Sequence, residues 1–440
     1  MKNVLIIASD YPPKLSMASR RPFCLSKYLP EYGWEAVVLT ITEKHRTIND
    51  HSGTHVIESD LLKKPAFIEV MLDIVHGRKR TTKSKIVGND IEGSPLISAS
   101  ELKGITMLRN ILFYPDRFFI SWYYNAIKTY RQVAKDIHID AIISTAKPFT
   151  THLIARHIKN KIHVPWVADF RDPWPHWKLY IDYTKYSPNY FINMMFFKWT
   201  LMKANILIAV TKPSAQLLRK RFKEKIVYNI PNGYDPDDYS QEINSKSNIF
   251  LLTYTGHVRE DRLDPEILLS CISQLILNKH IDSKKIKIRF YGEVTDKLLR
   301  DIERYRIKEL VEAKGYRINR NELIVKQKES SILVVFAALD QGEVGTMPGK
   351  VYEYLAAERP ILAIGKPAGR DVLEDIIKTT QAGVYARTKE ECKKTILFYY
   401  NQYVKTGKVR YSGIKSEIDK FSYKEIALKY AEALNKITDI

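Results

Sequence analysis

Runs of apolar, often β-branched residues recur along this chain, and patterns typical of helices separate them. Strands that alternate with helices predict parallel sheets wrapped by helices. The runs are almost continuously hydrophobic, which indicates strands buried on both faces. We expect strands at residues 2–9, 35–41, 140–146, 165–170, 204–210 and 225–231, and in the second half at 248–256, 285–292, 330–337, 360–365 and 382–386. The predicted fold class is α/β with doubly wound sheets.

The chain has 440 residues, more than one hydrophobic core usually supports. Polar residues interrupt the strand and helix pattern at about 239–248. We therefore expect an N-terminal domain of residues 1–240 and a C-terminal domain of residues 241–421. Residues 422–440 carry a final helical pattern.

Three segments need a separate interpretation. Turn and charge signals predict an irregular block over about 45–109. Residues 109–136 mix aromatic side chains with Arg and Lys, which favours a helix packed on a sheet, with a membrane-interface surface as the alternative. The most apolar stretch, 190–210, is interrupted by Lys198 and Lys203. It predicts a helix that packs on a sheet and then a strand, not a membrane-spanning helix.

The formal net charge of +20 leaves nucleic acid, anionic membranes and phosphorylated substrates open as partners. The basic clusters are scattered and no known nucleic-acid module is present, so we expect no nucleic-acid partner. Cys24, Cys271 and Cys392 lie far apart without a CxxC pair, which predicts buried or incidental thiols in a reducing compartment. The N-terminus becomes polar too soon for a secretory signal, so we expect a cytoplasmic protein.

The segment GEVGTMPGKVYEYLAAERP carries the best candidate for a phosphate site. Pro348 is suited to open a helix, and the preceding Gly345 and Thr346 can present backbone N–H groups to an anion. Lys350 lies in the first turn, where its ammonium could reach a phosphate. Glu353 follows one turn later and could accept hydrogen bonds from two hydroxyls. The competing interpretation is an amphipathic helix with a solvated Glu353.

Two more candidates follow predicted strands. One strand ends at Gly256, and Arg262 lies in the loop beyond it, where a guanidinium suits a diphosphate. Another strand runs directly into Asp169, Arg171 and Asp172. Open α/β sheets bind their ligands at such strand ends.

We expect no metal site. The Asp235-Pro236-Asp237 sequence resembles a metal-binding pair of carboxylates, but it follows a Pro-Asn-Gly turn and predicts the cap of a short helix. His152 and His157 are five positions apart and do not share a helical face, which argues against metal ligation.

Several of these segments, in this order, resemble the family-4 glycosyltransferases, and especially their bacterial polysaccharide and lipopolysaccharide branch. The matching segments are SDYPPKLSMASRRPFCLSKYLPEYGWEAVVLT, the PD of FYPDRFF, VADFRDPW, VTKPSAQLL, IPNGYDPDDY, TGHVREDRLDP and PGKVYEYLAAERPILA. The resemblance implies the GT-B architecture. In that architecture two Rossmann-like domains face each other across a cleft, and a C-terminal helix crosses back to the N-terminal domain.

The resemblance also implies roles for individual residues. Lys350 and Arg262 would hold the donor diphosphate, and Glu353 the ribose. The Asn232-Gly233 turn would line the interdomain cleft. Asp169, Arg171 and Asp172 would lie beside the transferred sugar, with Arg171 in the register where many relatives have a His. Asp169 or Asp172 would take the acceptor proton or pair with Arg171.

Two positions depart from the family pattern. Many relatives carry a second glutamate, separated by seven residues from the one matching Glu353, where this chain has Gly345, so that contact is either missing or supplied by the backbone or by Glu343. Residues 14–20 stand where many relatives have a glycine-rich first loop that closes over the donor phosphate. We expect either that Arg20 or Arg21 takes over the role of this loop, or that both are surface residues.

The expected function is metal-independent, retaining transfer of a sugar from a UDP- or GDP-linked donor, with no cofactor. The acceptor would be a lipid-linked or oligosaccharide precursor of a cell-surface polysaccharide, such as lipopolysaccharide or capsule. The basic charge fits a peripheral position on the inner face of the cell membrane. The alternatives are another GT-B enzyme, such as a nucleotide-sugar epimerase, or a non-catalytic protein that binds nucleic acid or an anionic membrane.

Overall fold

A computed structural model describes residues 1–14, 16–42, 54–62, 116, 118–134, 136–171, 188–241, 248–258, 265–315, 319–337, 347–365 and 372–439. The chain divides into two compact units. One holds residues 1–26, 34–169 and 183–205, and the other holds residues 27–33, 170–182 and 206–440. The expected domain boundary near residue 240 stays a prediction.

The first sheet has seven strands in the order β3-β2-β1-β4-β5-β6-β7. Pairing is parallel between β1 and β2, β1 and β4, β2 and β3, and β6 and β7. Val4 of β1 is in register with Ala36 of β2 and Ala141 of β4. The strands are β1 (Lys2–Ile7), β2 (Trp34–Ile41), β3 (His55–Ser59), β4 (Ala141–Ala146), β5 (Trp166–Phe170), β6 (Ile206–Ala209) and β7 (Ile226–Asn229).

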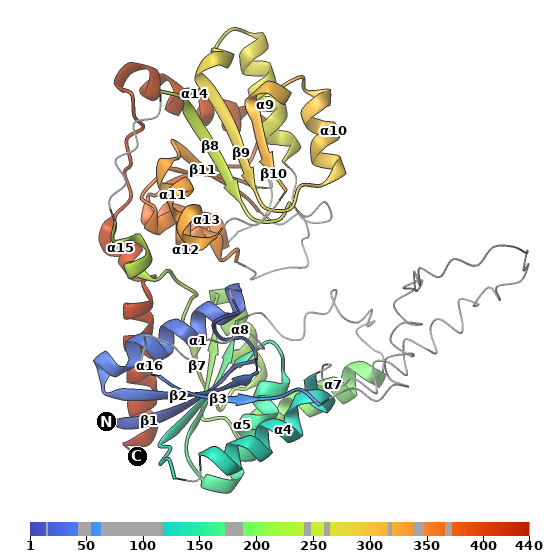
Figure 1. The fold of residues 1–440 in the computed structure, drawn as a ribbon, viewed down its shortest axis with the longest axis vertical. Coiled ribbons are helices and arrows are strands. Elements are labelled where there is room, and N and C mark those ends of the chain that lie inside the picture. The colour runs from blue at the N-terminus through green and yellow to red at the C-terminus, as the bar shows by residue number, and fades with distance from the viewer. Residues whose placement is uncertain are drawn as a thin grey trace, which may run out of the picture. The chain divides into compact units, whose positions relative to one another are not determined.

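Helices connect these strands, as Figure 1 shows. They are α1 (Met17–Tyr28), η1 (Leu29–Tyr32), α4 (Phe118–Val133), α5 (Thr150–Ile162), α7 (Pro188–Leu201), α8 (Lys212–Arg221) and η2 (Pro236–Tyr239). Side chains fix where several of them begin. Asp116 accepts hydrogen bonds from the backbone N–H and hydroxyl of Thr150 at the start of α5 (2.9 and 2.7 Å), and Thr211 accepts one from the backbone N–H of Ser214 in α8.

Two sequence predictions about this half are confirmed and one is wrong. Residues 118–133 form the expected helix, and α7 followed by β6 confirms the expectation for residues 190–210. The irregular block expected over 45–109 contains an edge strand, β3, which pairs with β2. In its sequence, HVIES, the buried Ile57 and Ser59 alternate with the exposed His55 and the half-buried Val56 and Glu58, because an edge strand is covered on fewer sides than a central one.

The second sheet has six strands, all parallel, in the order β10-β9-β8-β11-β12-β13. They are β8 (Phe250–Thr255), β9 (Ile286–Tyr291), β10 (Val311–Lys314), β11 (Ile332–Phe336), β12 (Ile361–Ile364) and β13 (Gly383–Ala386). The helices are α9 (Glu266–Leu277), η3 (Ser283–Lys285), α10 (Asp296–Arg304), η4 (Lys308–Leu310), α11 (Arg320–Glu329), α12 (Lys350–Ala356), α13 (Val372–Thr380), α14 (Lys389–Thr406) and α15 (Lys415–Asp419).

The central strands β4, β5, β8, β11 and β12 are buried at every position, as their continuous hydrophobicity predicts. Two parallel, helix-wrapped sheets confirm the predicted α/β class with two Rossmann-like domains. How these domains sit relative to one another stays a prediction.

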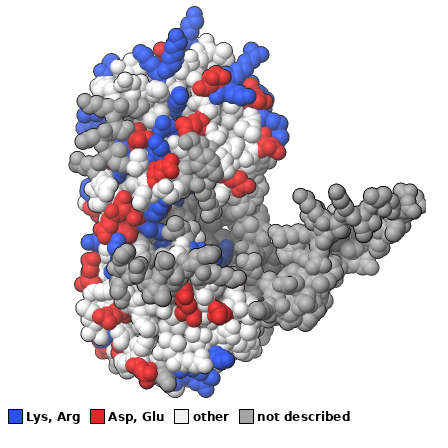
Figure 2. Space-filling model, viewed as in Figure 1, with Lys and Arg blue, Asp and Glu red and all other residues white. Residues whose placement is uncertain are grey.

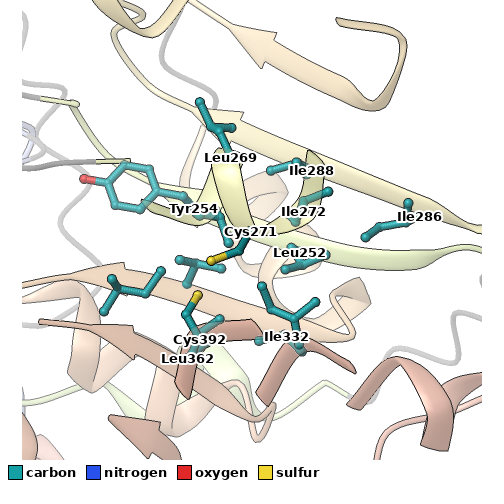
Figure 3. Packing of buried hydrophobic residues seen from close by; sticks show 14 of the residues in the cluster. Leu252, Tyr254, Leu269, Cys271, Ile272, Ile286, Ile288, Ile332, Leu362 and Cys392 are labelled. Atoms are coloured by element: carbon teal, nitrogen blue, oxygen red, sulfur yellow. The ribbon is translucent and has the colours of Figure 1, made fainter. Parts of the chain in front are cut away.

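All three cysteines are buried, as expected. Figure 3 shows Cys271 of α9 and Cys392 of α14 pointing toward each other within the core of the second sheet. A hydrogen bond between the two thiols lowers the pKa of Cys271 and raises the pKa of Cys392. The sequence shows these cysteines only as distant positions, so their contact is a product of the α9–α14 packing.

The last helix, α16 (Tyr423–Thr438), starts at Ser422, whose hydroxyl accepts from the backbone N–H of Glu425. It packs against η1, near the start of the chain, and Lys424 lies 3.7 Å from the carboxylate of Glu31. Within the described part of the chain, every helix is too short or too polar to cross a membrane.

On the face drawn in Figure 2, Lys and Arg side chains are interspersed with Asp and Glu. The excess of positive charge therefore does not form one continuous basic surface on the coloured part of that face.

Candidate active site

Two glycines meet where adjacent strands of the second sheet end. Gly256 follows β8 with a φ of 115°, and Gly292 follows β9 with a φ of 139°. Both values lie where side chains other than glycine are strained. A Cβ atom on Gly292 would lie 2.4 Å from the carbonyl oxygen of Gly256. The two backbones therefore pack closely at the carboxyl edge of the sheet, where α/β folds bind ligands.

Lys350, the first residue of α12, reaches this edge. Its Nζ lies 3.8 Å from the centroid of the Tyr254 ring. A Cβ atom on Gly256 would lie 2.6 Å from that Nζ, so the absence of a side chain at Gly256 makes room for the ammonium. The structure thus brings together two residues, Gly256 and Lys350, that the sequence analysis assigned to separate segments.

Burial lowers the pKa of Lys350 to about 7, and the negative charge of Glu353 opposes this shift. Desolvation disfavours the ammonium, whereas a nearby anion favours it. A diphosphate bound beside Nζ would therefore return Lys350 to its charged form. The residue is suited to bind an anion more strongly as the anion gains charge.

Tyr354 fixes the position of α12 against β8. Its hydroxyl accepts from the backbone N–H of Thr255 at 2.9 Å and lies 3.0 Å from the Thr255 side-chain oxygen. Tyr354 is four residues beyond Lys350, so this contact also sets the distance of Lys350 from Gly256. No local sequence pattern indicates this contact.

Glu353 is 7% exposed, and both of its oxygens have partners. Arg320 donates to Oε1 at 2.9 Å, and the Gln327 amide donates to Oε2 at 3.3 Å. The competing interpretation of a solvated Glu353 is therefore wrong. A carboxylate has about four lone-pair positions, so two further hydrogen bonds from hydroxyls remain possible.

Arg320 also binds Asp238 in η2, with Nε and Nη2 both donating to Oδ2 at 2.9 and 2.7 Å. Burial alone would lower the pKa of Arg320, but Glu353 and Asp238 outweigh this effect and raise it. Tyr239, the neighbour of Asp238, donates to the Gln327 side-chain oxygen at 2.9 Å. The short helix η2 therefore reaches Glu353 by two routes, through Arg320 and through Gln327.

Asp169 lies at the end of β5 and is fully buried. The buried guanidinium of Arg21 in α1 binds it through two bonds, Nε to Oδ2 at 2.9 Å and Nη2 to Oδ1 at 3.1 Å. A surface role for Arg21 is therefore wrong. Arg171 follows β5 and is half-buried. The catalytic roles of Asp169 and Arg171 stay predictions.

Gly233 packs against the C-terminal segment. A Cβ atom there would lie 2.2 Å from the carbonyl oxygen of Phe421 and 2.6 Å from Cδ1 of Ile426. The expected Asn232-Gly233 turn therefore has a packing reason for its glycine. Whether this turn also lines the interdomain cleft stays a prediction.

Asp235 caps η2 as predicted, because its side chain accepts from the backbone N–H of Asp237 at 3.2 Å. It also accepts from Tyr28 and from Lys27. His152 and His157 belong to separate networks: His152 Nδ1 lies 2.7 Å from the Ser144 hydroxyl, and His157 binds side chains of α4. Among the described residues, His, Cys, Asp and Glu form no group of three or more suited to a metal ion.

Four predicted site residues lie outside the described residues: Asp172, Arg262, Gly345 and Thr346. A cavity of about 640 Å³ lies near the opposite end of α12, where Ala357 and Glu358 line it with Tyr234 and Lys415. No predicted site residue lines this cavity, so it is not the candidate active site.

Comparison with known proteins finds one matching family model and several solved structures with a similar fold. The model of Glycosyltransferase Family 4 matches residues 102–238. Curated protein sequences give no match. Sucrose-phosphate synthase from Thermosynechococcus elongatus is similar in structure, with a TM-score of 0.62 and 12% identity over 100% of both chains.

Two further solved structures share the fold. HepE from Anabaena, in complex with UDP and glucose, has a TM-score of 0.58 and 13% identity over 99% of this chain and 100% of its own. A glycosyltransferase from Rickettsia africae has a TM-score of 0.57 and 14% identity over 99% and 98%. Residues 102–238 are thus similar to Glycosyltransferase Family 4, and the chain shares with these solved structures a fold of two Rossmann-like domains.

Proposed function

We propose that the chain transfers a sugar from a UDP- or GDP-linked donor to a saccharide acceptor, with retention of configuration at the anomeric carbon. The observation that carries the proposal is the Lys350 ammonium at the glycine-lined end of β8. Glu353 lies one helical turn away, with acceptor capacity left for two hydroxyls. This pair suits the diphosphate and the ribose of a nucleotide sugar.

The chemistry follows from where charge develops. As the bond between the anomeric carbon and the donor oxygen breaks, negative charge grows on the diphosphate leaving group. Fixed positive charge aimed at that group lowers the barrier. Lys350 supplies such charge from a partly desolvated position, where electrostatic interactions are stronger than in water. Arg262 and the backbone of Gly345 and Thr346 are proposed to complete the diphosphate site.

Asp169, Arg171 and Asp172 are proposed to lie beside the transferred sugar, with Asn232 and Gly233 at the cleft. No protein base is strictly required. The leaving phosphate can take the proton of the acceptor hydroxyl when the phosphate and the hydroxyl lie on the same face of the sugar. The proposal needs no metal.

The acceptor is proposed to be a lipid-linked or oligosaccharide precursor of a cell-surface polysaccharide, as in lipopolysaccharide or capsule synthesis. A net charge of +20 supports a peripheral place on the inner face of the cell membrane, since Lys and Arg near an anionic surface each contribute about 1 kcal/mol.

Thermal unfolding with UDP, GDP, ADP and CMP tests the donor site. A ligand at about 100 times its Kd stabilises the folded state by about 2.7 kcal/mol. One nucleotide diphosphate should raise Tm in the wild type and in Lys308→Ala, whose side chain is 74% exposed, but not in Lys350→Ala. If no nucleotide raises Tm, or if Lys350→Ala responds like the wild type, the proposed donor site is wrong.

Product analysis separates transfer from epimerisation. A nucleotide-sugar epimerase converts the donor alone, whereas a transferase requires the acceptor. Incubation with the stabilising nucleotide's sugar and no acceptor should leave the sugar's configuration unchanged. Conversion to an epimer would replace the proposed function with the alternative.

A further inference from the structure

Helix α7 is apolar around its whole circumference, although one side faces solvent. Its sequence PNYFINMMFFKWTL contains a single charged residue, Lys198. Phe197 and Leu201 are fully buried, yet Met195 on the other side is 73% exposed and Trp199 is 50% exposed. Helices that are apolar all round are usually buried on all sides. Exposed apolar surface of this kind marks a contact with a membrane or a partner.

The exposed side of α7 forms one continuous face, which we call the α7 face. It consists of Met195, Lys198, Trp199, Met202 and Lys203, all exposed. Their spacing of three and four positions places them on one side of the helix and its C-terminal end. Met202 is 59% exposed, so apolar side chains outnumber the two lysines on this face.

Trp199 is held in place at the α7 face. Its ring stacks on Phe196 with centroids 5.6 Å apart. The guanidinium of Arg156, from α5, lies 3.8 Å from the Trp199 ring and donates to its carbonyl oxygen at 2.7 Å. A cation and an indole are thus presented together, which suits the headgroup level of a bilayer.

The surrounding helices carry positive charge only. Helix α5 packs against both α4 and α7 (Figure 1). These three helices contain no Asp or Glu, although the chain has 50 of them in 440 residues. Their basic residues are Lys128, Arg131, Arg156, Lys159, Lys161 and Lys198. Positive charge on these helices attracts an anionic partner.

We propose that the α7 face docks on an anionic lipid surface, with Met195, Trp199 and Met202 entering the headgroup region and the lysines contacting lipid phosphates. The 14 residues of α7 are too few to cross a bilayer, which takes about 20, so the helix lies in the plane of the interface. Basic residues beside exposed Trp and Met favour a lipid surface over a protein partner. Docking of the α7 face on a membrane rests on the proposed function, because it would bring the enzyme to a lipid-linked acceptor.

Flotation with vesicles tests the α7 face directly. The wild type should float with phosphatidylcholine vesicles that contain phosphatidylglycerol, but not with phosphatidylcholine alone. Trp199→Glu and Met195→Glu should each weaken binding about tenfold or more, because a carboxylate replaces buried apolar area. Lys198→Gln and Lys203→Gln should each weaken it about fivefold, the equivalent of about 1 kcal/mol.

The matched control is Phe398→Glu, because Phe398 is a 57% exposed aromatic on α14. It should float like the wild type. The inference is overturned if the wild type does not float with anionic vesicles. It is also overturned if Trp199→Glu and Met195→Glu bind normally, if Phe398→Glu loses binding as they do, or if Trp199→Glu instead converts a dimer into a monomer.

Thermal unfolding of the same preparations with UDP and GDP distinguishes a failure of membrane docking from a failure of the proposed donor site. A nucleotide shift without vesicle binding would overturn the α7 face alone. Vesicle binding without a nucleotide shift would overturn the donor site and support the α7 face. The melting curves also show whether each variant is folded.

Discussion

Arg320 binds Glu353 and Asp238 at the same time, at 2.9 and 2.7 Å. This guanidinium therefore connects the carboxylate proposed to bind ribose with η2, the short helix that follows the Pro-Asn-Gly turn. Gln327 makes a second connection between the same two elements, through Tyr239. Glu353 is held from two sides, which restricts the directions in which its remaining lone pairs point.

Replacing Arg320 by Met should lower the free energy of unfolding by about 2 kcal/mol, because two partly buried carboxylates each lose a charged hydrogen-bond donor. Urea unfolding measures this change. Arg304→Met is the control, since Arg304 is 68% exposed and pairs with Glu266 at 3.2 Å. Its cost should stay below about 1 kcal/mol. Equal costs in the two variants would mean that Arg320 stabilises the fold no more than a surface residue does.

Ribose recognition by Glu353 can be measured with nucleotides that lack hydroxyls. The wild type should bind UDP or GDP, whichever is the donor nucleotide, about tenfold more tightly than its 2′,3′-dideoxy form. One hydrogen bond to a charged group contributes about 1.5 kcal/mol. Glu353→Gln should reduce this ratio, and Glu322→Gln, in the first turn of α11, should not. A ratio near one in the wild type would contradict the ribose role.

The low pKa of Lys350 predicts a pH dependence of nucleotide binding. In the free protein this pKa is about 7, and a bound diphosphate raises it, so binding above pH 7 takes up a proton. Affinity should be greatest below pH 7 and fall up to about tenfold per pH unit above it, until the bound-state pKa is reached. Calorimetry from pH 7 to 9 measures both affinity and proton uptake.

Lys350→Met should bind weakly and without this pH dependence, whereas Lys308→Met should behave like the wild type. The range above pH 7 is chosen because the terminal phosphate, with a pKa of about 6, is already ionised there. A wild-type affinity that does not change between pH 7 and 9 would show that the Lys350 ammonium does not meet the diphosphate.

The sequence predicted the central strands because a strand buried on both faces is hydrophobic throughout. It did not predict β3 and β10, whose sequences HVIES and VEAK carry charges at the sheet edges. Edge strands have a solvated side, so polar residues are compatible with them. Hydrophobic runs therefore identify the centre of a parallel sheet better than its edges.

The contact between Lys350 and Gly256 agrees with a general rule. In a parallel sheet, the carboxyl ends of the strands and the beginnings of the helices that follow them lie at the same edge. The partners of Glu353 did not follow from any local pattern. Arg320 and Gln327 are seven positions apart, which places them on one face of α11, but nothing in the sequence shows which element that face meets. Long-range contacts of this kind come only from the packed fold.

Variants of the ion pair between Arg21 and Asp169 can distinguish a structural role of Asp169 from a catalytic one. Both side chains are buried, with exposures of 1% and 0%. Removing one charge leaves the other buried without its partner, so Asp169→Asn and Arg21→Met should each cost about 3–5 kcal/mol. The double variant should cost less than the sum of the two, since it buries neither charge. Urea unfolding of all four proteins measures this coupling. If Asp169→Asn instead keeps full stability and loses sugar transfer, Asp169 acts in the reaction and the ion pair is not what the fold requires.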